Sequence, residues 1–101
     1  MIIYNITIKP EWSIHEAWLQ WLLKEHIPEM LATQLFYDYK MMRLLEVDDV
    51  DGPTYAIQYH AHKLEDYHHY LREYAPVQRR KGIEKWGDKF VAFRSLMQIV
   101  N

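Results

Sequence analysis

Apolar and polar residues alternate along residues 54–62, which is the pattern of a strand that buries one face. Successive side chains of a strand point to opposite faces, so every second residue lies on the same side. One face of this segment therefore carries mostly large apolar side chains, and the other carries small and hydrogen-bonding ones. The apolar face consists of Tyr55, Ile57, Tyr59 and Ala61, and the other face of Thr54, Ala56, Gln58, His60 and His62.

Similar patterns predict further strands on both sides of this segment. Residues 1–9 are rich in β-branched side chains and stop at Pro10, which cannot donate to a strand ladder. Residues 38–47 precede the 54–62 strand and are joined to it by an acidic turn at residues 48–53, so we expect a hairpin. Residues 89–100 form the last predicted strand.

Apolar residues at helical spacing predict a helix after the first strand. It should begin with a capping box, in which the side chains of Ser13 and Glu16 bond to each other's backbone amides. Pro28 disfavours helical geometry at Ile27, so we expect a break there. A short second helix over residues 28–33 would then begin with this proline.

A second helical region follows the hairpin and contains Pro76, which should interrupt it. The first part is marked by an apolar stripe at helical spacing, and the second part covers residues 77–86. Gly87 is the expected C-terminal cap of the second part. The stripe consists of Leu64, Tyr67, Leu71 and Tyr74.

The resulting order, β-α-β-β-α-β, predicts an α+β domain of the ferredoxin-like type over residues 1–101. Its sheet would be four-stranded and antiparallel. Because crossover connections are right-handed, both helical regions should cover the same face of this sheet.

The last strand is apolar on both faces, which a single layer of helices cannot cover. One face carries Val91, Phe93, Met97 and Ile99, and the other carries Phe90, Ala92, Leu96 and Val100. We therefore predict a homodimer in which two copies pack sheet to sheet. The alternative is that the aromatic ends of the helices fold round the edge of the sheet.

Composition and charge exclude several classes of function. The net charge is −2, and the one basic cluster, at residues 79–81, is followed closely by Glu84 and Asp88. This mixture of charges indicates a solvated helix face, and we expect no nucleic-acid partner. There is no cysteine, which excludes disulfides and thiolate chemistry. No apolar run approaches the ~20 residues that span a membrane, and no signal peptide precedes the first strand, so we expect a soluble cytoplasmic protein without a membrane partner.

Three motifs resemble a family of short, uncharacterised bacterial proteins within the dimeric α/β-barrel superfamily. They are W-x-x-W-x-x-x-E-H-I-P at residues 18–28, R-L-L-E-V-D at residues 43–48 and F-V-A-F-R at residues 90–94. The resemblance implies sheet-to-sheet dimers with a cavity in each protomer, between sheet and helices or inside the barrel. The superfamily includes cofactor-free oxygenases, haem-degrading enzymes, lactone isomerases and ligand-binding regulators, and fold alone does not choose among them.

Polar residues on the strands are the first candidates for ligand binding. By strand parity we expect a polar group on the face away from the helices, and we select Asn5, Gln58, His60 and Arg94 from it as ligand-binding residues. Arg94 would either bind a ligand carboxylate through two parallel hydrogen bonds or pair with Glu46 across the dimer. The full polar group is Asn5, Thr7, Gln58, His60, Arg94 and Gln98.

Histidines are the candidates for catalysis. His26 precedes the expected helix break, where it would either cap a freed carbonyl or act as a general base in a pocket, and His60 is a second candidate base. His60 and His62 share a strand face at a spacing that can chelate a metal, but no third ligand is fixed by spacing, so we predict no metal site. The superfamily resemblance implies that a haem would be held by His68 or His69, and these would otherwise be surface histidines.

These observations favour a homodimer that binds a small molecule in an aromatic-lined cavity without a cofactor. One alternative is a cofactor-independent oxygenase, such as a monooxygenase, or an isomerase, with His26 or His60 as base and Asn5 or Arg94 polarising a carbonyl. A haem-binding relative and a purely structural homodimer are the other two.

Overall fold

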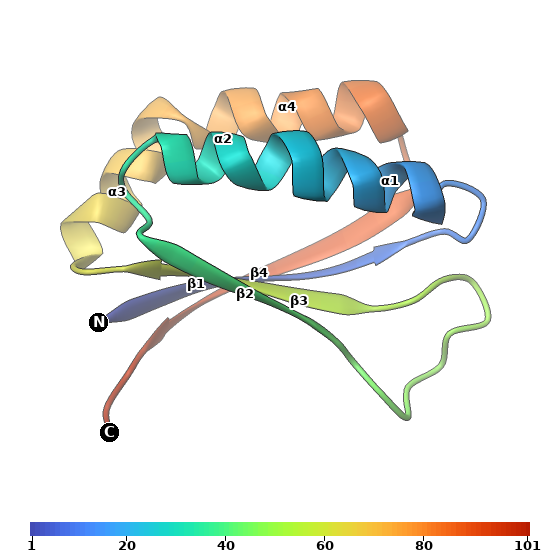
Figure 1. Ribbon diagram of the computed structural model, residues 1–101, viewed down its shortest axis with the longest axis horizontal. Helices are drawn as coiled ribbons and strands as arrows, with labels where there is room; N and C mark the ends of the chain where they lie inside the picture. Colours follow the sequence, from blue (N-terminus) through green and yellow to red (C-terminus); the bar gives the residue numbers. More distant parts are fainter.

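The computed structural model describes residues 1–101 and has helices packed on one face of a four-stranded antiparallel sheet (Figure 1). The strand order is β2-β3-β1-β4. The predicted α+β, ferredoxin-like arrangement is therefore confirmed. The elements are β1 (Ile2–Pro10), α1 (His15–Trp21), the π-helix η1 (Leu22–His26), α2 (Ile27–Ala32), β2 (Asp38–Arg43), β3 (Tyr55–Ala61), α3 (Leu64–Glu73), α4 (Ala75–Trp86) and β4 (Phe90–Gln98).

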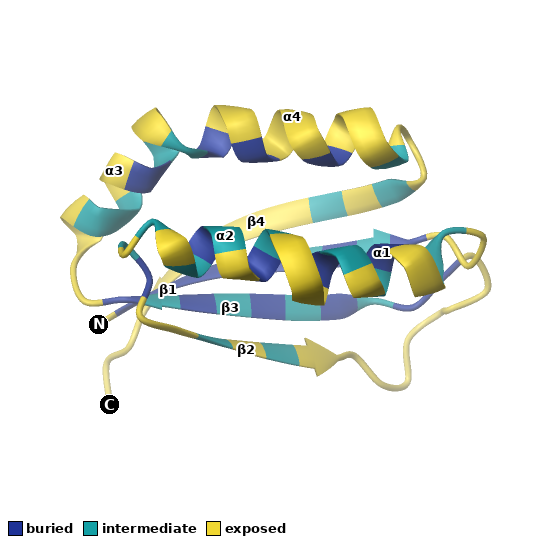
Figure 2. Ribbon diagram, turned by 45° about the horizontal axis from the view of Figure 1, so that its top comes forward, coloured by how far each residue is buried: buried dark blue, intermediate teal, exposed yellow.

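The core lies between the helices and the two central strands, β1 and β3 (Figure 2). The apolar face of β3 that the alternation predicts is the buried one. It pairs with the apolar face of β1, where Tyr4 lies opposite Tyr59 and Ile6 opposite Ile57. Trp18 and Leu22 pack onto these residues from the helices and are fully buried.

The start of α1 differs from the predicted capping box. Its N-cap is Ile14, and no side chain caps the helix. The helix is instead started by two backbone bonds of a preceding turn, from the Ile14 amide to the Glu11 carbonyl and from the His15 amide to the Trp12 carbonyl. The Trp12 indole also donates to the Asp49 carbonyl at 2.8 Å. Contacts with the distant acidic loop therefore fix this helix entry, and local capping does not.

The predicted break at Ile27 is wrong, because the chain stays helical through Pro28. The turn widens into the π-helix η1, in which the Ile27 amide donates to the Leu22 carbonyl, five residues back. Pro28 then occupies the first turn of α2, directly after the π-helix, and because it has no amide proton one intrahelical bond is absent there. A single-turn π segment of this kind changes the direction in which its side chains point.

The hairpin between β2 and β3 has a longer loop than expected. Strand β2 ends at Arg43, and the predicted extension to residue 47 is wrong, because Glu46 adopts a φ of 58° that turns the chain away from the sheet. The far end of the loop is held tightly at Gly52. A Cβ atom there would lie 1.8 Å from the Pro10 carbonyl oxygen, so only glycine allows this approach.

The second helical region agrees with the prediction, with Pro76 in the first turn of α4 and Gly87 as its C-cap at a φ of 62°. Helix α3 departs from the predicted apolar stripe. Tyr70, which is not part of that stripe, is buried, whereas Leu64, which is part of it, is exposed. No helix combines the length and the apolar character that crossing a membrane requires.

Strand β4 is offset by one residue from the expected parity. Arg94 lies opposite Ile6 and Leu96 opposite Tyr4, so these residues of β4 share the helix-covered face. The face away from the helices carries the apolar residues Val91, Phe93 and Met97, and Phe93 is 69% exposed in the single chain. Exposed apolar side chains are therefore present on the open side of the sheet.

Candidate functional site

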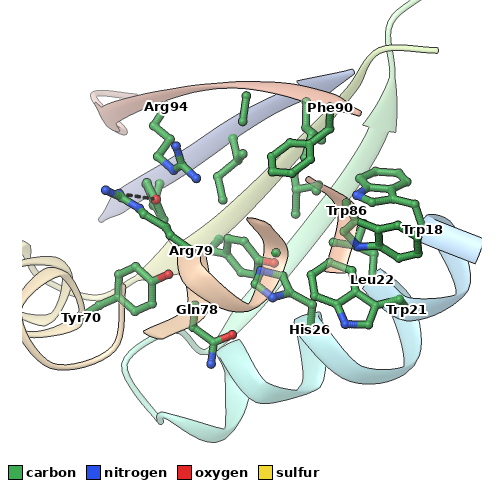
Figure 3. A pocket seen from close by; sticks show the side chains of 17 residues that line it. Trp18, Trp21, Leu22, His26, Tyr70, Gln78, Arg79, Trp86, Phe90 and Arg94 are labelled. Carbon is green, nitrogen blue, oxygen red and sulfur yellow. Dashed lines mark hydrogen bonds between the residues drawn. The ribbon is translucent and has the colours of Figure 1, made fainter. Parts of the chain in front are cut away.

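A cavity of about 60 Å³ lies between the helices and strands β1, β3 and β4. Its walls are formed mostly by aromatic and aliphatic side chains (Figure 3). Three of the four tryptophans contribute to it, namely Trp18, Trp21 and Trp86. A volume of this size is enough for roughly five water molecules or a small organic group.

One end of the cavity is aromatic. The rings of Trp21 and Trp86 meet edge to face with their centroids 5.9 Å apart, and Phe90 lines the cavity from the start of β4. Gly82 of α4 lies opposite Phe90 and brings the helix close to the strand. Aromatic rings arranged in this way give a flat apolar surface for a ligand.

His26 enters the cavity from the π-helix and stacks on Trp21, with ring centroids 4.9 Å apart (Figure 3). Burial lowers the pKa of His26 from its usual 6.5 to about 4, and the charges of Lys81 and Arg94 act in the same direction. Glu29 and Gln78 oppose this shift without reversing it. The imidazole is therefore neutral at pH 7, and it could present a free lone pair to a bound molecule.

Four buried side-chain atoms have no hydrogen-bond partner, and all four belong to residues that line this cavity. Gln78 is 8% exposed and Tyr59 is fully buried, so neither group reaches bulk water. Buried polar atoms are almost always paired in proteins, and an unpaired one costs about 1–3 kcal/mol. The atoms are His26 Nδ1, Tyr59 Oη, Gln78 Oε1 and Trp86 Nε1.

Two arginines line the cavity from opposite layers. Arg79 of α4 donates to the buried Tyr4 hydroxyl at 3.3 Å, and Arg94 projects from β4 (Figure 3). Burial alone would lower the pKa of the Arg79 guanidinium, but this hydrogen bond and the nearby tyrosines raise it. No aspartate or glutamate lines the cavity, so its walls carry two positive charges.

The carboxylate nearest to His26 is already engaged on the outer side of α2. Glu29 accepts bonds from Gln78 and Lys81, each at 3.1 Å. Burial would raise the pKa of Glu29, but the bonds from Lys81 and Gln78 outweigh it and lower the pKa. The same contact fixes the Gln78 amide nitrogen outward, so that its oxygen is left on the cavity side.

Tyrosine hydroxyls complete the polar groups of the cavity. Burial raises the pKa of Tyr59 and Tyr70 well above the usual value, and neighbouring tyrosines add to the shift. Both phenols therefore stay protonated and can act only as neutral hydrogen-bonding groups. With a neutral His26 and two charged arginines, the cavity can bind an anionic or carbonyl-bearing molecule and can accept a proton from it.

The sequence-predicted ligand set is divided between the two faces of the sheet. Arg94 lies in the cavity, whereas Asn5, Gln58 and His60 lie on the face away from the helices, as the strand register requires. The placement of Arg94 beside the other three is wrong, because the β4 parity differs by one residue. Arg94 lies on the helix-covered face, which is not the face expected for a dimer contact with Glu46.

Asn5, Gln58 and His60 form part of a polar strip across the open face. The buried Asn5 amide donates to Thr7 at 3.0 Å and to Ser95 at 3.3 Å. Gln58 lies directly opposite Asn5, and His60 follows on the same face of β3. The Asn5 amide is satisfied by these neighbouring hydroxyls, and none of the three predicted residues reaches the cavity.

The remaining histidines lie outside the cavity. His68 and His69 are exposed on α3, beside charged residues such as Asp66 and Arg72. Neither lines the cavity, so the arrangement does not fit a haem held there through either residue. His62 stacks on Tyr37 with ring centroids 4.1 Å apart, and no cluster of three His, Asp or Glu side chains that could hold a metal ion is present.

Sequence reasoning missed the contribution of α4 to the site. The prediction that residues 79–81 form a solvated face holds for Arg80, which pairs with Glu84 on the surface, but Arg79 lines the cavity. Gln78, Gly82 and Trp86 recur at intervals of four, which places them on one helix face. This spacing was the available signal, and it is weak because the face carries few apolar residues.

Solved structures of similar fold match almost the whole chain at low sequence identity. An EthD (ethyl tert-butyl ether d) family protein from Bacillus halodurans is 12% identical, with a TM-score of 0.68 over 98% of this chain and 100% of that one. The hydroxynitrile lyase from Passiflora edulis is 13% identical, with a TM-score of 0.65 over 99% and 96%. A dimeric ferredoxin-like protein from an uncultured marine organism is 9% identical, with a TM-score of 0.67 over 99% and 96%.

These likenesses establish the fold and leave the chemistry open, because unrelated functions share this architecture. A search of curated proteins gives no match. One family model matches residues 1–100, and it is described as a domain of unknown function, DUF4286. The motifs at residues 18–28, 43–48 and 90–94 lie within the matched range. The chain therefore belongs to the DUF4286 family.

Proposed function

We propose that this protein binds a small, largely apolar molecule in the cavity between its helices and sheet, and that it does so as a homodimer. The binding proposal rests on four buried polar atoms that have no hydrogen-bond partner. All four belong to residues that line one cavity. Elsewhere in the chain every such buried side-chain atom has a partner. A ligand with two or three polar atoms on an apolar body would satisfy this set.

The aromatic walls allow direct measurement of binding. Three tryptophans line the cavity, so a bound molecule should change their fluorescence and raise the thermal midpoint. Gly82→Leu would place a side chain into the space beside Phe90 and should reduce both signals in a screen of small aromatic compounds. Arg80→Leu adds the same residue to the exposed side of α4, away from the tryptophans, and should leave them unchanged. Equal responses from the two variants would exclude the cavity as the binding site.

The homodimer proposal is supported by the apolar residues on the open face of the sheet. Val91, Phe93 and Met97 are exposed there, next to the buried Ile3 of β1. A solved protein of this fold is described as a dimeric ferredoxin-like protein. Sedimentation velocity at micromolar concentration should give a dimer for the native chain and a monomer for Phe93→Glu. Val77→Glu, on the outer surface of α4, should remain dimeric, and a native monomer would refute the proposal.

A second candidate function is cofactor-independent proton transfer, as in an isomerase or an oxygenase. Its support is the neutral His26 imidazole, whose buried Nδ1 atom has no partner and faces a cavity that also holds Arg94. Such a base could remove a proton next to a carbonyl while the arginine stabilises the resulting enolate. His60 and Asn5 cannot take these roles in the same cavity, because they lie on the opposite face.

Proton exchange tests this second candidate without knowledge of the natural substrate. Phenylpyruvate deuterated next to its carbonyl should lose deuterium faster in the presence of the native protein, as followed by NMR. His26→Gln should abolish the acceleration and His68→Gln should retain it. Acceleration that persists in His26→Gln would remove His26 as the base, and no acceleration in the native protein would argue against this chemistry.

A further inference from the structure

We infer that the cavity selects a monocarboxylate, with the carboxylate held between Arg79 and Arg94 and the apolar body against the tryptophans. This inference rests on the proposed binding function and names the chemical class of its ligand. The two ends of the cavity differ, as Figure 3 shows, with both arginines on one side and Trp18, Trp21 and Trp86 on the other. His26 lies between them.

The charge of the lining is the first argument. The whole chain carries a net charge of −2, yet the cavity walls hold two arginines and no carboxylate. His26 is neutral at pH 7 and adds no further charge. Figure 3 shows both arginines on the same side of the cavity as Tyr70. Two positive charges gathered at one end of a partly buried space favour an anion.

The second argument is the difference between these arginines and others in the chain. Arg43 pairs with Asp49 and Arg80 pairs with Glu84 on the surface. Arg72, Arg79 and Arg94 have no carboxylate partner, and of these three only Arg79 and Arg94 line the cavity. Arg79 is nevertheless held in place by its bond to the Tyr4 hydroxyl, and Tyr4 is itself buried under the helices. An oriented guanidinium without an anion is suited to receive a carboxylate in a bidentate contact.

The size of the cavity limits the apolar body. A cavity of about 60 Å³ has room for one small apolar group and none for a long chain. A phenyl ring or a short branched chain would fill the aromatic end, and the carboxylate would reach the arginines at the other. The unpaired Trp86 and Tyr59 groups belong to residues that line the same cavity and could bind further polar atoms of the ligand.

Benzoate and benzamide test the inference as a matched pair, because they share shape and differ in charge. Binding is measured by tryptophan fluorescence of the native chain and of Arg79→Gln, Arg94→Gln and Arg80→Gln. The native chain should bind benzoate at least about tenfold more tightly than benzamide. Arg79→Gln and Arg94→Gln should each reduce this preference to about twofold or less, while the affinity for benzamide stays constant. Arg80→Gln should behave as the native chain, because Arg80 pairs with Glu84 outside the cavity.

The outcomes separate this inference from the proposed function. Equal affinity for benzoate and benzamide, or a benzoate preference that survives both cavity arginine variants, would overturn the carboxylate assignment while leaving cavity binding intact. Tighter binding of phenylphosphate than of benzoate would assign the arginines to a phosphoryl group and refute the monocarboxylate. A chain that binds none of these probes and gives no response in the wider aromatic screen would refute both the inference and the function on which it rests.

Discussion

The buried His26 should make the stability of this protein fall in mildly acid solution. Burial lowers the pKa of His26 to about 4 in the folded chain, whereas in the unfolded chain it returns to about 6.5. Between these two values the unfolded state binds more protons than the folded state. The free energy of unfolding therefore decreases as the pH falls from 6.5 towards 4, and the effect is absent above pH 7.

The size of this effect follows from the two pKa values. Linkage between pKa 6.5 and about 4 gives a loss of roughly 2 kcal/mol between pH 7 and pH 5 from this residue alone. Glu29, whose pKa is also lowered on folding, adds a loss at more acid pH. His26→Gln removes the histidine contribution and keeps a polar side chain of similar length at the same position.

Urea unfolding at pH 7 and pH 5, followed by circular dichroism, measures the difference directly. The native chain should lose roughly 2 kcal/mol more than His26→Gln over this interval. His68→Gln, which replaces an exposed histidine of α3, should lose as much as the native chain. An equal loss in the native chain and His26→Gln would refute the claim that the cavity holds a neutral, desolvated imidazole.

Three further substitutions test how the chain is held together. Gly52→Ala should lower the free energy of unfolding by about 3 kcal/mol in urea titrations, because the new Cβ would overlap the Pro10 carbonyl. Val50→Ala, an exposed position in the same loop, is the control and should change this free energy by less than about 0.5 kcal/mol. Gly82→Ala should raise the thermal midpoint, since it stabilises a helix by about 0.5–1 kcal/mol and the new methyl group meets only an ordinary contact; a lowered midpoint would contradict this. Ser13→Ala should leave stability within about 0.5 kcal/mol, and a loss of about 1 kcal/mol would show that Ser13 caps the helix after all.

The candidate site was only partly predictable, because its residues come from seven separate elements. His26 could be named from its place before Pro28, and Arg94 from its isolation in an apolar strand. The sequence could not show that a π-helix turns His26 towards Arg79 and Gln78, which follow it by about fifty residues. Long-range packing brings these side chains together, and no local pattern encodes it.

The sequence by itself determined the order of the elements, the helix interruption at Pro76, the cap at Gly87 and the buried face of β3. These features depend on backbone restrictions of single residues and on an alternation with one clearly apolar face. The tertiary structure decided which face of β4 meets the helices. Both faces of that strand are apolar, so its own pattern is unchanged by a shift of one residue, and only pairing with β1 places Arg94 in the cavity.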